Sequence, residues 1–469
     1  MRIKSIFSNS GGILFSRIFG FIRDTIMASV LGANVYSDIF AVAFKLPNLF
    51  RRIFAEGAFT QSFMPSFIAA RYKSIFSIKI LLYLLGFIIF LSLLVNIFAY
   101  PISKLLAPGF DVDTLIITSK YVALQFWYLP LIFIVTFLGA LLQYKEHFAT
   151  TAFATTLLNI ALIAAMLLYK DASKEEILLA MSWGVIVGGI LQVIAHLIMA
   201  KKLNLLKLLR YGAKNFKNKQ DIVKEDTKRF FKNFFPAIWG NSTLQIMSFL
   251  DTWLASFLVS GSISYLYYGN RIFQLPLALF AIALSTAIFP TISKKIKSKD
   301  IKEALIEFRK GFWILLYLLT AATVIGIIFS NEIIWLLFER GAFTRENTIS
   351  VGGVLVMYMI GLIPFGLNKL FSLWLYANHQ QKTAAKIATI SLVVYSIVAI
   401  TLIKPLGAQG LALAGSIVGF LNLFLTIKYF GVEKLLDIVD KSKLFNYTII
   451  LSIFTIFIAF IHIFWLHIN

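Results

Sequence analysis

The sequence predicts an all-α polytopic membrane protein with about thirteen transmembrane helices, arranged as two six-helix lobes and one extra C-terminal helix. Hydrophobic residues make up 59% of the 469 residues and charged residues only 14%. Apolar stretches of about twenty residues, long enough to cross a bilayer, recur from end to end. A weak internal repeat divides these stretches into two sets.

Each apolar stretch is interpreted as one membrane crossing. The thirteen predicted spans lie at 9–31, 36–67, 80–100, 118–143, 149–169, 177–200, 233–259, 263–292, 311–330, 349–377, 386–403, 407–427 and 444–466. The predicted domains are an N-terminal lobe at 1–200, a basic amphipathic linker at 201–232, a C-terminal lobe at 233–430, and a linker with the last helix at 431–469.

The internal repeat lies in the second and eighth spans. FKLP at 44–47 resembles FQLP at 273–276, and six spans separate the two copies. This separation is expected for parallel six-helix repeats related by an axis along the membrane normal. Lys45 of the first copy corresponds to Gln274 of the second, so the lobes differ in charge.

The basic residues are distributed unevenly between the two sides of the membrane. The net charge is +22, and with the N-terminus inside, 29 of the 44 Lys and Arg residues fall in inner segments and six in outer ones. The positive-inside rule explains this bias, so the charge does not indicate nucleic-acid binding. The N-terminus is predicted to be cytoplasmic and, after thirteen spans, the C-terminus periplasmic.

Residues typical of catalysis or metal binding are scarce. The chain has no cysteine, which excludes disulfides, thiolate metal ligands and a cysteine nucleophile. Its five histidines are scattered without metal-ligand spacing. We therefore expect no catalytic residue, no metal site and no bound cofactor, and we expect the protein not to be an enzyme.

Ionisable residues cluster in the first two predicted spans, where each charge at mid-bilayer costs about 2.5–3.5 kcal/mol. Membrane crossing does not require these charges, so they are expected to line a polar cavity. Cations outnumber anions five to three, which favours an anionic ligand. The cluster consists of Arg17, Arg23, Asp24, Asp38, Lys45, Arg51, Arg52 and Glu56.

Helical spacing arranges part of this cluster. Asp38, Lys45, Arg52 and Glu56 fall on one narrow stripe of an ideal helix, and Arg52 and Glu56 are spaced to pair. Asp24, Asp38, Arg52 and Glu56 suit internal ion pairs between helices, with a gating role, as well as they suit direct contact with the substrate. Arg17, Arg23, Lys45 and Arg51 suit substrate binding better, because their charges exceed those of the nearby anions.

Two later charges and two prolines complete the candidate residues. Arg271 lies inside the eighth span and is either a snorkelling arginine or part of the anion site. Asp251, deep in the seventh span, would bind a coupling cation or proton, or pair with an arginine. Pro47 and Pro364 are candidate hinges. An arginine-rich cavity suits phosphate or pyrophosphate, because guanidinium groups bind such anions in a bidentate manner.

The segments SRIFGFIRD, SDIFAVAFKLPNLFRRIFAEGAFTQSFMPSF and SYLYYGNRIFQLP resemble the MurJ (MviN) family, the lipid II flippases of the multidrug/oligosaccharidyl-lipid/polysaccharide (MOP) exporter superfamily. The resemblance implies two lobes around a central cationic cavity. It implies alternating access that carries the undecaprenyl-pyrophosphate-linked peptidoglycan precursor from the inner to the outer leaflet. The family's essential arginines fall on Arg17, Arg23, Arg51 and Arg271, and its charged cavity and gate on Asp38, Lys45 and Glu56.

The sequence departs from this family in two respects. The family commonly has fourteen spans, the last two forming a lipid-tail groove, whereas thirteen are predicted here. Some members bind sodium at an aspartate that matches Asp251, but Ala399 stands where an asparagine is expected. Moving a net charge through the membrane field is worth about 2.3 kcal/mol per 100 mV, so we expect coupling to the membrane potential or to a monovalent cation, with the Ala399 position arguing against sodium.

Alternative functions remain open at this level. They are a flippase for another undecaprenyl-pyrophosphate-linked oligosaccharide, a MATE-like drug/cation antiporter, and a membrane scaffold for cell-wall assembly. The antiporter would need an acid-lined cavity, whereas this one is basic. We expect a location in the bacterial inner membrane, with lipid II and membrane lipids as partners, cell-wall synthesis proteins as further candidates, and no nucleic acid.

Overall fold

The computed structural model describes residues 3–52 and 58–468, and every regular element in this part of the chain is a helix. The predicted all-α class is therefore confirmed. The chain divides into two compact units: unit 1 comprises Met1–Gly261 with Arg340–Phe343, and unit 2 comprises Ser262–Glu339 with Thr344–Asn469. This division places the predicted seventh span in unit 1. The predicted domain boundaries stay a prediction.

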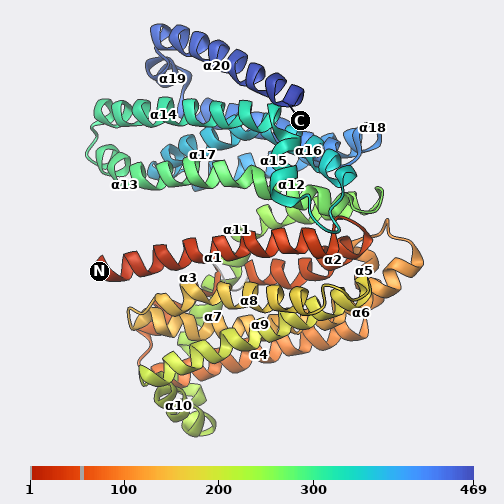
Figure 1. The fold of residues 1–469 in the computed structure, drawn as a ribbon. Helices are drawn as coiled ribbons and strands as arrows, with labels where there is room; N and C mark the ends of the chain where they lie inside the picture. The colour runs from red at the N-terminus through yellow and green to blue at the C-terminus, as the bar shows by residue number, and fades with distance from the viewer. Residues whose placement is uncertain (1–2, 53–57, 469) are drawn as a thin grey trace. The chain divides into compact units, whose positions relative to one another are not determined.

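The helices of unit 1 are drawn from red to green in Figure 1. They are α1 (Ile3–Leu31), α2 (Val35–Phe50), α3 (Phe59–Ala69), α4 (Lys73–Ile97), α5 (Ala99–Leu106), α6 (Val112–Phe126), α7 (Tyr128–Tyr144), α8 (Ala149–Leu168), α9 (Lys174–Lys202), α10 (Leu205–Lys219), η2 (Gln220–Val223) and α11 (Lys224–Ala255).

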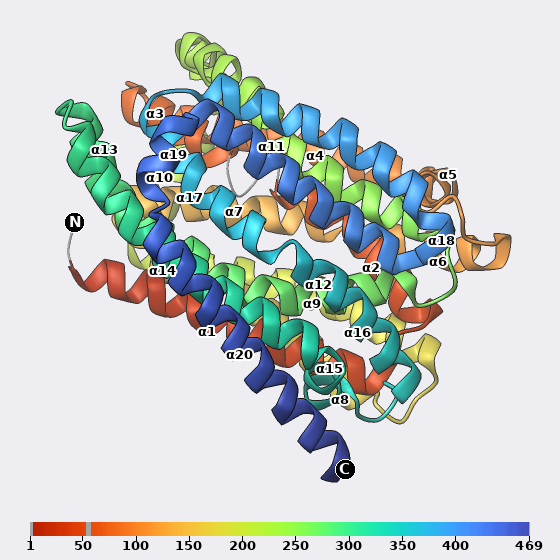
Figure 2. The ribbon, with the colours of Figure 1, turned by 90° about the horizontal axis from the view of Figure 1, so that it is seen from above.

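Unit 2 follows with α12 (Ser262–Pro276), η3 (Leu277–Ile282), α13 (Ala283–Lys297), α14 (Ile301–Ile328), α15 (Ser330–Phe338), α16 (Arg345–Ile360), α17 (Leu362–Ala377), α18 (Gln381–Phe430), α19 (Val432–Ile438) and α20 (Lys441–Ile468). Figures 1 and 2 show α20 beside α14 at the edge of this unit.

Eight helices of the described chain are long and apolar enough to cross a membrane, or nine if α16 and α17 form one bent span. The chain is thus a multi-pass membrane protein. The number is lower than thirteen partly because α18 is counted once, although it comprises two helices that meet at Gly407, whose backbone is not helical. These two helices correspond to the predicted spans 386–403 and 407–427. The predicted span 36–67 includes residues outside the described ranges. The count of thirteen stays a prediction.

Close helix packing and buried polar contacts hold unit 1 together. At Gly188 of α9 an added Cβ would lie 2.7 Å from a Leu158 side-chain carbon of α8, so the missing side chain permits this approach. Gln192 of α9 accepts a hydrogen bond from the Tyr128 hydroxyl (3.2 Å) and donates one to the Ala154 carbonyl (2.9 Å). These contacts join α7, α8 and α9 inside the apolar core.

Local sequence sets several helix starts. Asn34 and Ser173 form capping boxes at α2 and α9. At the start of α6, Asp111 accepts hydrogen bonds from the backbone N–H of Thr114 (2.9 Å) and from its hydroxyl (2.7 Å). These bonds stabilise the carboxylate and lower the pKa of Asp111 below its ordinary value.

A short segment from later in the chain completes unit 1. The backbone N–H of Ala342 donates to the Ser29 carbonyl near the end of α1 (2.7 Å). Gly341 has a φ of +58°, and a Cβ there would lie 2.3 Å from the Ser29 carbonyl oxygen. Glycine is required at this position both by its backbone conformation and by the close approach.

Polar contacts anchor the last helix of unit 2. The Tyr447 hydroxyl of α20 shares a hydrogen bond of 2.6 Å with the Thr320 hydroxyl of α14. Farther along α20, the His462 ring lies 3.0 Å from a carboxylate oxygen of Glu332. Between these contacts α20 presents a mostly apolar, exposed surface, as expected for a helix that faces lipid.

Candidate functional site

Arg23 and Asp24 form an ion pair on α1 that reaches across to α8. The Arg23 Nε and Nη2 atoms donate to Asp24 Oδ1 at 3.0 and 2.5 Å. Arg23 Nη1 donates to the side-chain oxygen of Asn159 on α8 at 3.1 Å. Asp24 is completely buried, and 18% of the Arg23 side chain is exposed. The Arg23 guanidinium therefore bonds to a buried carboxylate while part of its side chain stays accessible.

Arg17 has a different environment on the same helix. It is exposed, while the preceding Ser16 contacts Thr155 of α8 through its hydroxyl. Asn159 also donates to the Ser16 carbonyl at 3.3 Å. One asparagine thus fixes the backbone of α1 beside Arg17 and the guanidinium of Arg23.

Two predicted residues of α2 bond to residues in α11 or shortly after its end. Asp38 is only 2% exposed, and its Oδ2 accepts a hydrogen bond from the backbone N–H of Gly261 at 2.7 Å. Lys45 donates to the Ser248 hydroxyl at 2.8 Å. Asp251, one turn beyond Ser248, acts electrostatically on Lys45. Asp38 and Lys45 therefore lie on the same side of α2.

The end of α2 carries the remaining predicted cations of unit 1. Arg51 donates from Nε and Nη2 to the Asn48 side-chain oxygen, at 3.2 and 2.9 Å. Arg52 is exposed and acts electrostatically on Lys45. Residues 51 and 52 have π-helical backbone. Glu56 lies outside the described residues, so its predicted pairing with Arg52 stays a prediction.

Arg271 lies on α12 in unit 2. Gly269 and Phe273 on the same helix pack against α16, because a Cβ at Gly269 would contact Val354 and the Phe273 ring stacks on Tyr358. Helical spacing places Arg271 on the opposite side of α12. Its side chain is partly exposed.

The two candidate hinges lie in different surroundings. Pro47 is buried, and α2 continues through it as far as Phe50. Pro364 lies in the first turn of α17, where proline is well tolerated. The chain bends by 40° between α16 and α17, at Gly361. Whether either proline acts as a hinge stays a prediction.

Within unit 1, three cations each have a side-chain hydrogen-bond partner. Arg23 bonds to the carboxylate of Asp24, Lys45 to the hydroxyl of Ser248, and Arg51 to the amide oxygen of Asn48. Among the described residues no group of three His, Asp or Glu side chains is arranged to hold a metal ion. The contacts can fix cations in position within membrane helices, an arrangement suited to binding an anion.

The partner residues were not identified from the sequence. Asn159, Ser248 and Asn48 are neutral, so they do not carry the high insertion cost that marks a charged residue in a membrane helix. Asn48 offered the only local signal, since it lies three residues before Arg51 and thus on the same helix face. Gly261 bonds through its backbone, which sequence patterns do not reveal.

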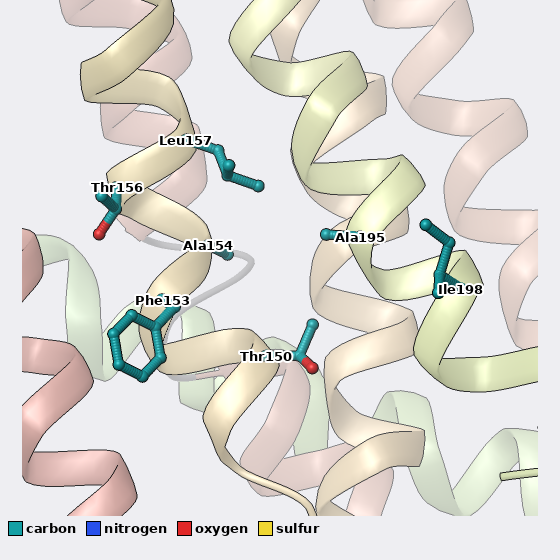
Figure 3. Close-up of a pocket in the computed structure, with 7 residues that line it drawn as sticks. All are labelled: Thr150, Phe153, Ala154, Thr156, Leu157, Ala195 and Ile198. Atoms are coloured by element: carbon teal, nitrogen blue, oxygen red, sulfur yellow. The ribbon is translucent and has the colours of Figure 1, made fainter. Parts of the chain in front are cut away.

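A pocket of about 410 Å³ lies between α8 and α9 in unit 1. Figure 3 shows its lining, which is mostly apolar, with the hydroxyls of Thr150 and Thr156 as polar groups. No predicted site residue is among those that line it. Its lining consists of Thr150, Phe153, Ala154, Thr156, Leu157, Ala195 and Ile198.

Comparison with known proteins gives concordant matches. The family model "Lipid II flippase MurJ" matches residues 27–469. A probable lipid II flippase MurJ from Helicobacter pylori (strain J99) is 50% identical over 425 residues, which are 89% of this chain and 92% of that protein. One from Buchnera aphidicola (subsp. Baizongia pistaciae) is 33% identical, over 90% of this chain and 82% of that protein.

The fold has a close counterpart among solved structures. A lipid II flippase MurJ in an inward closed conformation has a TM-score of 0.77 at 24% identity, covering 98% of this chain and 99% of that one. At this identity the likeness shows the fold. The family model and the relatives establish more: the chain belongs to the MurJ family of lipid II flippases.

Proposed function

We propose that this protein is a flippase that moves lipid II from the inner to the outer leaflet of a bacterial cytoplasmic membrane, for cell-wall synthesis. The observation that carries the proposal is its membership of the MurJ family over residues 27–469. The charge of the membrane helices supports it, because lipid II carries an anionic pyrophosphate and arginine is the side chain best suited to bind such a group.

The proposed substrate contacts are made by Arg17, Arg23, Lys45, Arg51 and Arg271. These cations would bind the pyrophosphate and the peptide carboxylates when the cavity opens to the inside. Asp38 and Glu56 would pair with cations as the substrate leaves. Asp24 and Arg52 would form ion pairs that hold the first two helices together while the cavity changes from inward-open to outward-open. Support comes from Arg23, Lys45 and Arg51, which are each held by at least one hydrogen bond and are thus positioned before substrate arrives.

The proposal also includes coupling and orientation. Moving one net charge through the membrane field is worth about 2.3 kcal/mol per 100 mV, so the membrane potential would reset an empty, cationic cavity. Asp251 is the proposed site for a monovalent coupling cation. The N-terminus would lie in the cytoplasm and the C-terminus in the periplasm, in accord with the charge bias.

The decisive experiment is replacement of an authentic lipid II flippase in a depletion strain, with outer-leaflet lipid II as the readout. The wild-type chain should restore delivery. Alanine variants at Arg17, Arg23, Arg51 and Arg271 should abolish it while the protein remains in the membrane. Arg229→Ala removes an exposed arginine at the start of α11 and serves as the matched control. Normal delivery by all four variants would overturn the site assignment.

Two further readouts separate the alternatives. Export of a different lipid-linked oligosaccharide without lipid II delivery would identify another cargo. Resistance to organic cations without lipid II delivery would identify an antiporter. For coupling, collapse of the membrane potential should slow delivery in vesicles, and an unchanged rate would refute voltage-driven reset.

A further inference from the structure

Helix α10 carries a cationic stripe that the proposed function does not use. The stripe consists of Lys207, Arg210, Lys214 and Lys217, all of which are exposed. At 100° per residue these four positions fall within about 80° of one another on the helix surface. From the first to the last, the stripe is about 15 Å long.

The opposite side of α10 is packed against the rest of unit 1. Leu205 is buried, and a Cβ at Gly212 would lie 2.2 Å from the Ser74 carbonyl oxygen of α4. Just after α10, the Gln220 carbonyl accepts a hydrogen bond of 2.8 Å from Lys79 of α4. Lys79 is only 5% exposed. These contacts hold α10 in one orientation, with its cationic stripe turned outward.

The contacts place α10 beside the first turns of α4. Lys73–Ile97 is a candidate membrane span, and Ser74 and Lys79 lie near its start, which the charge bias predicts to be cytoplasmic. Figure 1 shows α10 at the edge of unit 1, beside the ends of α4 and α9. Tyr211, 57% exposed, flanks the stripe, and tyrosine is typical of the headgroup region.

The charges of the stripe are not neutralised within the protein. Helix α10 contains no acidic residue, and in the described part of the chain none of the four cations forms an ion pair. A row of uncompensated cations beside the start of a candidate membrane span is complementary to an anionic lipid surface. A soluble polyanion would not require the helix to lie beside the ends of membrane spans.

We propose that the Lys207–Arg210–Lys214–Lys217 stripe is a docking surface for anionic phospholipid headgroups of the inner leaflet. Each cation near an anionic leaflet strengthens binding about fivefold. Because the interaction is electrostatic and partly exposed, it should weaken as the salt concentration rises.

The test measures phospholipid binding to the full chain, so its outcome is independent of lipid II transport. Native mass spectrometry in detergent micelles would give the Kd for phosphatidylglycerol and, for comparison, phosphatidylcholine. Replacing all four stripe residues by Gln should raise the phosphatidylglycerol Kd at least tenfold. Replacing the three stripe lysines by Arg should leave it unchanged. The matched control replaces four exposed cations of the predicted outer segments by Gln: Lys104, Lys170, Arg345 and Lys404.

Three results would overturn the proposal: an equal rise in Kd for the control, equal affinity of the wild type for phosphatidylcholine, or displacement of phosphatidylglycerol by glycerol 3-phosphate at matched concentration. A second measurement covers a stripe variant that does not fold. The chain has no cysteine, so Asn218→Cys places one spin label beside the stripe. Its mobility should fall in phosphatidylglycerol bilayers relative to phosphatidylcholine bilayers, and equal mobility would contradict the proposal.

Discussion

Replacing Asp38 by alanine should destabilise unit 1. The carboxylate is 2% exposed and accepts the backbone N–H of Gly261, itself buried, at 2.7 Å. A hydrogen bond to a charged group contributes about 1.5–3 kcal/mol, and a buried donor left without an acceptor costs a similar amount. We therefore expect Asp38→Ala to lower the free energy of unfolding by about 2 kcal/mol, roughly a thirtyfold shift in the ratio of folded to unfolded protein.

The assay is unfolding of the full chain by SDS titration in mixed micelles. Asp38→Asn separates charge from geometry, because the amide oxygen still accepts the N–H of Gly261. Its cost should be smaller, near 1 kcal/mol. The control is Asp171→Ala, which removes an exposed carboxylate in a loop and should change stability by less than about 0.5 kcal/mol. Equal stability of the Asp38→Ala variant and the control would refute the reasoning.

Three further variants test helix packing and capping. Gly212→Val should displace α10 from α4, because its side chain would overlap the Ser74 carbonyl, and faster hydrogen exchange confined to α10 would report this; unchanged exchange would contradict it. Gly341→Ala should cost more than about 1 kcal/mol of unfolding free energy, since it strains a positive φ and meets the Ser29 carbonyl; an unchanged SDS midpoint would show that the contact is dispensable. Asp111→Ala should cost about 1 kcal/mol. Because the pKa of Asp111 is lowered, the wild-type advantage should be present at neutral pH and lost as the pH falls through that pKa; a pH-independent difference would argue against the cap.

The fold class was predictable because it depends on the average hydrophobicity of long stretches of sequence, not on single residues. Burying backbone polar groups in lipid permits only helices or closed barrels, and apolar stretches of about twenty residues favour helices. Span boundaries depend on single residues. Gly407 has a non-helical backbone and divides α18 into two helices, close to the boundary predicted between the spans 386–403 and 407–427. The hydrophilic linker was predicted to be amphipathic, but the sequence did not show that Gly212 would seat its helix on α4.

The charged site residues could be predicted from the sequence, because a charge in a membrane helix has a high free-energy cost. Their hydrogen-bond partners could not be predicted in this way. Arg23 and Asp38 stand out because charge in an apolar helix is expensive. Asn159 and Gly261 do not, because one is a neutral side chain 136 residues away from Arg23 and the other acts through its backbone. The sequence thus indicates where charge is retained, and the fold decides which neutral groups hold it.

The contact of Lys45 allows this distinction to be tested. A cation paired with a carboxylate is neutralised, whereas one held by a hydroxyl is fixed in place and keeps its charge. Lys45 bonds to the Ser248 hydroxyl at 2.8 Å, and among the described residues it forms no ion pair. If Lys45 binds the pyrophosphate, a carboxylate at position 248 should compete with the substrate for the same ammonium group.

We therefore expect Ser248→Asp to reduce outer-leaflet lipid II delivery more than Ser248→Ala does. The alanine variant loses one hydrogen bond, worth about 1 kcal/mol, but leaves the positive charge available. The aspartate variant supplies a new ion pair, so it should be no less stable than the alanine variant in SDS titration. Ser442→Asp, which adds the same charge at an exposed position of α20, is the matched control and should deliver normally. If Ser248→Asp delivers lipid II as well as the wild type, the charge of Lys45 does not act on the cargo, and its bond to α11 is only structural.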